Sequence, residues 1–156
     1  HIIRDPIAMV VSGYLYHLHN DDTPTPLQVI RNMSMADGLA EEARFVIETQ
    51  GKEMAEVYSS DLPWVMNVRF ESFAQSSESF DEAAAEVYSH MLRGFYTEGQ
   101  RKELARRAVK HDLHRNRTDD KQGHVAKAAM KESVKAVVNA IPRRLLRDLK
   151  GLRKEL

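Results

Sequence analysis

Apolar residues recur at intervals of three and four along most of this 156-residue chain, which is the spacing of helices that pack one face on a core. The first such stripe runs from Ile7 to Leu18 and predicts a helix that ends at about His19. After a polar break, a second helical stretch is expected to start near Pro26 and a longer one to follow Ser34. The first part of the chain is therefore expected to be mostly helical.

The same helical spacing continues in the second half. Ser79 and Glu82 stand three residues apart, as in a capping box, and predict the start of another helix. The expected inner face of this helix consists of Ala84, Val87, Tyr88, Met91 and Leu92. Further helices are predicted over residues 98–113, 125–140 and 143–152.

Two short apolar segments have the composition of strands. Ile2 and Ile3 precede the first helix, and residues 64–70 are rich in apolar and β-branched side chains, as in a buried parallel strand. Together with the helices they predict an α/β fold that is mostly helical in this portion. Ligands of such folds bind at the carboxyl ends of the parallel strands, which is where Arg4 stands in the sequence.

The composition fits one globular piece. Hydrophobic residues make up 42% of the chain, which is enough for a single core, so one domain is expected. The 23 basic and 23 acidic residues cancel, and we expect no nucleic-acid partner because no overall field would recruit one. The sequence also lacks cysteine and any apolar run as long as a membrane span, so no span is predicted. Its compartment is left open between the cytoplasm and the Golgi lumen.

The seven histidines do not predict a metal site. Two pairs have short spacings, His17 with His19 and His111 with His114, but neither forms the glutamate-centred zinc motif. Such histidines are more typical of a surface or a helix end.

The junction between the first strand and the first helix has the residues of a phosphate site. Asp5 can cap the new helix, and Pro6 suits its first turn because proline lacks only an N–H that would be unpaired there. Arg4 adds a planar fork of donors for a phosphate, and Ser12 lies about two turns along the helix, on the same side as the cap. The alternative is a capped junction in which Arg4 pairs with a carboxylate.

The order of these residues resembles a known family. Arg4-Asp5-Pro6, with Ser12 eight residues after the arginine, resembles the 3′-phosphate-binding segment of the sulfotransferases that use 3′-phosphoadenosine 5′-phosphosulfate. The resemblance implies that Arg4 and Ser12 bind the 3′-phosphate of this donor. It also implies transfer of a sulfuryl group to a hydroxyl or amine of a small molecule or a glycan.

Two later segments are similar to the same family. Residues 64–73 resemble its later strand, but Phe70 stands where the family usually has a tyrosine, so it offers the nucleotide a ring and no hydroxyl. Residues 115–125 resemble the basic loop that closes over the 3′-phosphate. There the resemblance places Arg117 or Lys121 against the phosphate, and Gly123 would let the backbone approach closely. An ordinary solvated loop is the alternative for this segment.

The family's loop around the 5′-phosphosulfate, a Lys-Thr-Gly-Thr-like sequence after a strand, has no counterpart in these 156 residues. We therefore expect residues 1–156 to be the C-terminal part of a single sulfotransferase domain with an incomplete, P-loop-like parallel sheet. The catalytic base and the lysine of that loop are expected outside this segment, which alone is expected to be inactive.

Two other functions fit parts of the sequence. The basic, leucine-spaced residues 143–154 and the high helix content suit a helical interaction or regulatory module without catalysis. An arginine at a strand end also suits another nucleotide-dependent transferase, such as a kinase. The residues upstream would separate the three functions, because each transferase has its own phosphate loop.

Overall fold

The computed structural model describes residues 1–20, 22–112, 114–116 and 130–156. In these ranges the chain is mostly helical and has one small parallel sheet, as the sequence predicts. The described residues gather into two compact units, residues 1–4 with 61–116 and residues 5–60 with 130–156. That both units belong to one sulfotransferase domain with a P-loop-like sheet stays a prediction.

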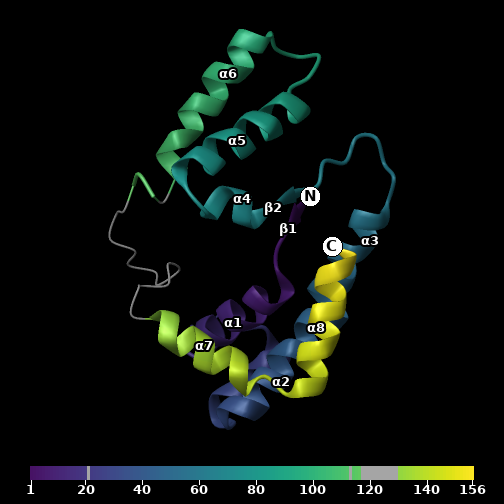
Figure 1. The fold of residues 1–156 in the computed structure, drawn as a ribbon, viewed down its shortest axis with the longest axis vertical. Helices are drawn as coiled ribbons and strands as arrows, with labels where there is room; N and C mark the ends of the chain where they lie inside the picture. The colour runs from purple at the N-terminus through teal and green to yellow at the C-terminus, as the bar shows by residue number, and fades with distance from the viewer. Residues whose placement is uncertain (21, 113, 117–129) are drawn as a thin grey trace. The chain divides into compact units, whose positions relative to one another are not determined.

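The first unit is built on a parallel pair of short strands, β1 and β2 (Figure 1). Ile2 pairs with Val68 and Ile3 with Arg69, so the two carboxyl ends lie side by side. The elements of this unit are β1 (Ile2–Ile3), β2 (Val68–Arg69), α4 (Phe70–Ala74), α5 (Ser77–Met91), α6 (Glu98–Arg107) and the 3-10 helix η3 (Ala108–His111).

The strand expected over residues 64–70 is wrong for most of its length. Trp64 is 71% exposed and lies in a turn that the Val65 N–H closes on the Leu62 carbonyl at 2.9 Å. Phe70 is already the first residue of α4. In the described sheet, β2 pairs only with β1. Because β1 has two residues, the ladder of hydrogen bonds between them cannot extend β2 beyond two residues.

Helix α5 starts earlier than the sequence predicts. Ser76 is its N-cap and accepts a hydrogen bond from the Ser79 N–H, while the Ser79 hydroxyl accepts one from the Ser76 N–H. The box expected between Ser79 and Glu82 is therefore wrong, because Ser79 completes the box of Ser76. Met91, expected on the inner face, is 66% exposed. The inner face that forms consists of Phe80, Ala83 and Ala84.

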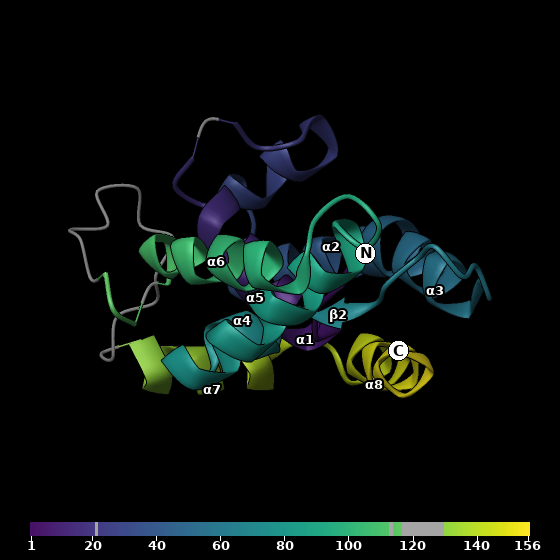
Figure 2. The same cartoon turned by 90° about the horizontal axis from the view of Figure 1, so that it is seen from above.

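Helices α5 and α6 lie side by side in both ribbon views (Figures 1 and 2). A second capping box, between Thr97 and Gln100, begins α6. The helix expected over 98–113 is shorter than predicted, because α6 ends at Arg107 and gives way to η3.

The second unit packs helices around one hydrophobic cluster. Its elements are α1 (Pro6–His17), the 3-10 helix η1 (Thr25–Asn32), α2 (Met35–Val46), the π-helical turn η2 (Ile47–Gly51), α3 (Lys52–Ser59), α7 (Met130–Ala140) and α8 (Arg143–Glu155). The cluster takes fully buried side chains from several of these elements, among them Val10, Ile30, Leu39, Val46 and Leu149. Leu149 shows that α8 is a packed helix with one solvated face.

Several sequence predictions for this unit are confirmed. Asp5 caps α1 by accepting the Ile7 N–H at 3.0 Å, and Pro6 is the first helical residue. Ser34 caps the long helical run of α2, η2 and α3, which ends at Ser59. The stretch near Pro26 is helical as well, but of the 3-10 type.

A buried hydrogen bond between two side chains joins α1 to α2. His17 Nδ1 lies 2.8 Å from Glu42 Oε2, and the Glu42 side chain is 2% exposed. Burial raises the pKa of Glu42, and the hydrogen bond and charge of His17 oppose this shift with smaller effects. The two helices approach closely here because Gly13 has no side chain, and a Cβ at this position would overlap the Glu42 carboxylate.

None of the helices in the described ranges is both long and apolar enough to cross a bilayer.

Candidate anion-binding site

The parallel register brings Arg4 and Phe70 together. Ile3 and Arg69 form the last pair of the ladder, and Arg4 and Phe70 are the next residue of each chain segment. Both therefore leave the sheet at its carboxyl edge, where ligands of α/β folds bind. Since Phe70 also begins α4, its backbone is held between a strand on one side and a helix on the other.

Arg4 stacks on the Phe70 ring. The guanidinium carbon lies 4.6 Å from the ring centroid, which is within the range of a cation–π contact. The contact orients the guanidinium plane but satisfies none of its N–H donors, because the face of an aromatic ring is a far weaker acceptor than an oxygen. Phe70 is 38% exposed, so this side of the site is open to solvent.

The Arg4 guanidinium has no anionic partner within the described residues. Its Nε is buried and donates a hydrogen bond to none of them, and no carboxylate of theirs forms an ion pair with Arg4. The alternative of an arginine closed by a carboxylate is thus not found in this part of the chain. A buried donor without an acceptor is unfavourable, whereas a phosphate or sulfate would accept two of its parallel N–H bonds.

Ser12 lies on α1, in the second unit, and Arg4 belongs to the first. The Ser12 side chain is exposed and hydrogen-bonds to none of the described residues. Near the start of the same helix, the Asp5 carboxylate caps Ile7 and also accepts the Arg153 Nε–H at 3.0 Å. That Ser12 shares a ligand with Arg4 stays a prediction.

Three of the predicted phosphate-loop residues, Arg117, Lys121 and Gly123, lie outside the described residues. The segment just before them is held in the first unit, where Arg115 forms a two-pronged ion pair with Asp81 at 2.6 and 2.7 Å. The Arg115 guanidinium holds the pKa of Asp81 below its ordinary value. The Arg115 guanidinium is therefore already paired with a carboxylate.

Two of the four histidines in the short-spaced pairs make structural contacts through their side chains. His17 binds Glu42, and His114 Nε2 lies 2.9 Å from the Ala74 carbonyl. Among the residues that the structure describes, no three metal-ligating side chains gather at one point.

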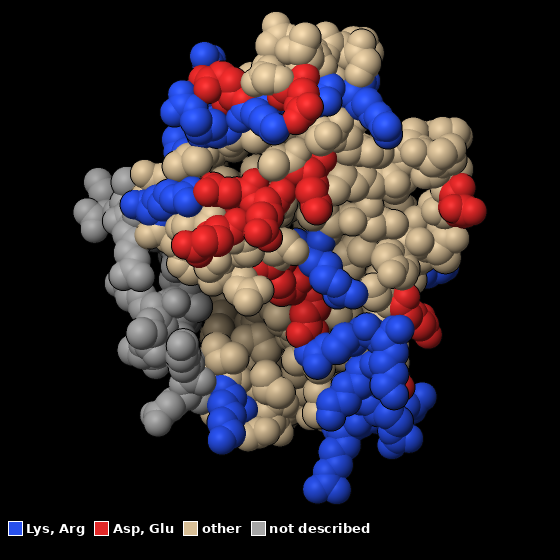
Figure 3. All heavy atoms as spheres, turned by 45° about the horizontal axis from the view of Figure 1, so that its top comes forward, with Lys and Arg blue, Asp and Glu red and all other residues tan. Residues whose placement is uncertain are grey.

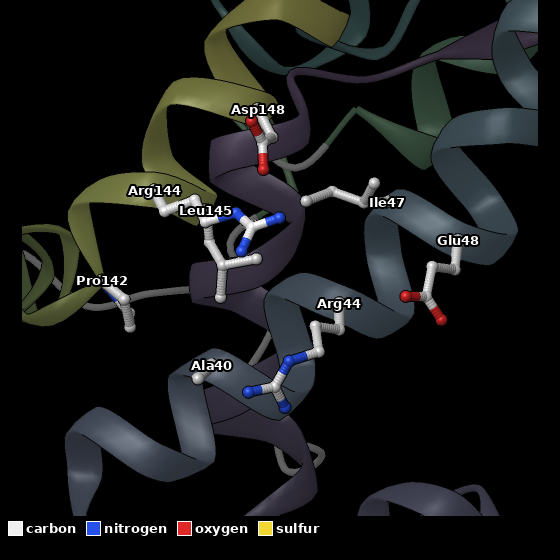
Figure 4. A pocket seen from close by; sticks show the side chains of 8 residues that line it. All are labelled: Ala40, Arg44, Ile47, Glu48, Pro142, Arg144, Leu145 and Asp148. Carbon is white, nitrogen blue, oxygen red and sulfur yellow. The ribbon is translucent and has the colours of Figure 1, made fainter.

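A shallow pocket of about 420 Å³ lies between α2 and α8 in the second unit (Figure 4). Cations and carboxylates alternate in its lining, which consists of Ala40, Arg44, Ile47, Glu48, Pro142, Arg144, Leu145 and Asp148. Arg44 is already paired with Glu41. Because neither sign of charge dominates the lining, the pocket does not have the chemistry of a phosphate site.

Sequence reasoning selected Phe70 as a nucleotide contact and missed its contact with Arg4. The available signal was the pair of predicted parallel strands, since residues that directly follow neighbouring strands meet at one edge.

Comparison with family models, with curated proteins and with solved structures gave no match.

Proposed function

We propose that Arg4 binds the 3′-phosphate of 3′-phosphoadenosine 5′-phosphosulfate, and that the chain is part of a sulfotransferase. The observation that carries the proposal is the Arg4 guanidinium, which stands at the carboxyl edge of the sheet with a buried Nε that has no acceptor among the described residues. The resemblance of Arg4-Asp5-Pro6 and Ser12 to the family's segment supports the same assignment.

The chemistry of the ligand fits this group. A 3′-phosphate presents several anionic oxygens, and a guanidinium can donate two parallel N–H bonds to two of them. The Phe70 ring keeps the guanidinium plane in one orientation, so less side-chain freedom is lost when the phosphate binds. A family tyrosine would add a hydroxyl here, and Phe70 supplies only the platform.

In the proposed reaction, an acceptor hydroxyl or amine attacks the sulfur in line with the departing phosphate oxygen. A base takes the acceptor's proton, and cationic groups stabilise the charge that develops on the leaving oxygen. Arg4 would act at the far end of the donor. Its proposed role is positioning, because binding of a remote group is converted into correct placement of the reacting one. A small molecule or a glycan would be the acceptor.

Titration calorimetry with three nucleotides tests the proposal. Adenosine 3′,5′-bisphosphate, the desulfonated product, should bind, and adenosine 5′-monophosphate should bind at least about tenfold more weakly because it lacks the 3′-phosphate, a loss of roughly 1.4 kcal/mol. ATP should also bind weakly.

Two results would contradict the sulfotransferase assignment. Equal binding of all three nucleotides would favour another nucleotide-dependent transferase, such as a kinase. No binding of any of them would favour a helical interaction module.

A further inference from the structure

The pocket between α2 and α8 combines aliphatic side chains with charges of both signs. Its volume of about 420 Å³ lies within the range of small-molecule sites. The apolar part of its lining is aliphatic and consists of Ala40, Ile47, Pro142 and Leu145. Ile47 and Leu145 also pack against the hydrophobic cluster of the second unit. The pocket therefore suits a small ligand with an aliphatic part, and it offers no aromatic ring on which a base could stack.

One side of this pocket is formed by the π-helical turn η2, which supplies Ile47 and Glu48. Such turns are rare, and they occur frequently at functional sites. The two helical segments touch directly after these residues, since a Cβ at Gly51 would overlap the Leu152 side chain of α8. The pocket precedes this contact on both segments, so packing close by holds the backbone that carries its lining.

Arg144 gives the pocket an uncompensated positive charge. The other arginine of the lining, Arg44, is paired with Glu41, whereas Arg144 forms no ion pair with any described residue. Arg144 also lies in the first turn of α8, which has no side-chain cap, and the positive end of the helix dipole adds to its charge. This part of the pocket favours a carboxylate, which can accept two parallel N–H bonds from a guanidinium.

Asp148 and Glu48 give the same pocket two uncompensated negative charges. Asp148 follows Arg144 by one turn of α8, about 6 Å along the helix axis, where opposite charges can pair. No ion pair forms between them. Figure 3 shows Lys and Arg side chains gathered over the part of the surface where Figure 1 draws α8, and Asp148 pairs with none of the described cations.

The side chains of both helices converge on the pocket. In Figure 4, Arg144 and Asp148 extend from α8 into the pocket, and Glu48 extends from the opposite segment. An anion alone would meet two carboxylates, and a cation alone would meet a guanidinium, so either would be repelled by a like charge. A ligand with an ammonium and a carboxylate on one carbon atom would satisfy both signs at once.

We propose that this pocket binds an aliphatic α-amino acid in its zwitterionic form. The ammonium group donates to the carboxylates of Asp148 and Glu48, and the carboxylate accepts from the Arg144 guanidinium. The aliphatic side chain packs on Ile47 and Leu145, which removes apolar surface of both from water. The site lies within the second unit and does not depend on the nucleotide site at Arg4.

Titration of the isotope-labelled full chain with leucine, followed by two-dimensional NMR, tests this pocket. The backbone amides of Ala40, Ile47 and Leu145 should shift as leucine binds. Three analogues each lack one group: leucinamide lacks the carboxylate, isocaproate lacks the ammonium, and glycine lacks the aliphatic chain. Each analogue should bind about tenfold or more weakly than leucine, because one of the three contacts is lost.

Two single substitutions assign the charges to the ligand's two groups. Arg144→Gln should weaken leucine binding about tenfold and leave leucinamide binding unchanged, because leucinamide has no carboxylate to lose. Asp148→Asn should weaken leucine binding without weakening that of isocaproate. The matched controls, Arg143→Gln and Glu155→Gln, change exposed charges of α8 that do not line the pocket. Both controls should bind leucine as the wild-type chain does.

A thermal melt of each variant shows whether it folds, and all four should melt at the wild-type temperature because the altered side chains are exposed. The analogues are compared on the wild-type chain, so this comparison stands even where a variant unfolds. Leucinamide that binds as tightly as leucine would overturn the proposal in favour of a cation site, and isocaproate that does so would favour an anion site. Equal losses in the controls, or no shift of the pocket amides at the highest soluble leucine concentration, would also overturn it.

Discussion

The guanidinium carbon of Arg4 lies 4.6 Å from the centroid of the Phe70 ring, at the point where both residues leave the parallel ladder. Replacing Phe70 with leucine removes the cation–π contact and frees the arginine. We expect Phe70→Leu to weaken binding of adenosine 3′,5′-bisphosphate by about twofold to fivefold, which corresponds to about 0.5–1 kcal/mol for such a contact. Calorimetry measures the change.

The Phe70→Tyr variant is the control for this prediction. It keeps the ring and restores the residue usual in the sulfotransferase family, so its affinity should equal or exceed that of the wild-type chain. Unchanged affinity in Phe70→Leu would show that the ring does not orient the arginine for the ligand.

Glu42 predicts a pH dependence of stability. Burial raises its pKa above the ordinary value of 4.5, so the folded chain holds the proton more tightly than the unfolded chain. Its contribution to stability is therefore fully present below the unfolded pKa and is lost as pH rises through the folded pKa. The Glu42→Gln variant cannot ionise, and should gain stability relative to the wild-type chain as pH rises through this window.

Urea unfolding at a series of pH values, from acid to neutral, measures the Glu42 effect. Glu48→Gln, which changes an exposed glutamate nearby, is the control for loss of a carboxylate. The opposite result would contradict this prediction: the wild-type chain would become more stable relative to the Glu42→Gln variant as pH rises. The attraction of His17 would then outweigh the cost of burying the Glu42 charge.

Gly13 and Gly151 form a matched pair of helix glycines. A Cβ at Gly13 would overlap the Glu42 carboxylate, which its bond to His17 holds in place, whereas a Cβ at Gly151 meets nothing within 4 Å. Gly13→Ala should lower the free energy of unfolding by about 1–3 kcal/mol through overpacking. Gly151→Ala should raise it by up to about 1 kcal/mol, since alanine is the better helix former. Chemical denaturation that ranks the two variants in the reverse order would rule out the tight contact at Gly13.

Asp5 combines a helix cap with an ion pair. Asp5→Ala removes both its bond to the Ile7 N–H and its contact with Arg153, and should cost about 1–2 kcal/mol of stability. Asp5→Asn keeps an oxygen that can cap the helix but loses the charge. Because surface ion pairs contribute about 0–1 kcal/mol, most of the stability should remain in the asparagine variant. If the two variants lost equal amounts of stability, the ion pair with Arg153, and not the helix cap, would be the source of the Asp5 contribution.

The helices of the second unit could be predicted from sequence because their boundaries depend on neighbouring residues. Asp5 with Pro6, and Ser34, are local caps that need no distant partner.

At the start of α5, in the first unit, the local signal at Ser79 was ambiguous, because the preceding Ser76 is an equally good cap. The helix begins at the earlier serine, which brings Phe80 to the core.

The strand around Val68 could not be delimited from sequence. An apolar run such as 64–70 shows where a strand is possible, but its length depends on the partner strand, which here has two residues. The contact of Arg4 with Phe70 follows from that pairing, and so required the register. That Arg4 is free of a carboxylate of the described residues is a property of the whole first unit, which no local motif determines.

The most direct test of the central claim is the coupling between Arg4 and the 3′-phosphate. Binding of adenosine 3′,5′-bisphosphate and of adenosine 5′-monophosphate is measured by calorimetry for the wild-type chain and for Arg4→Gln. The account predicts that removing the 3′-phosphate weakens binding to the wild-type chain by about 2 kcal/mol, or about 30-fold, and has little effect on Arg4→Gln. Equal losses in both proteins would contradict it, because Arg4 would then make no contact with the 3′-phosphate.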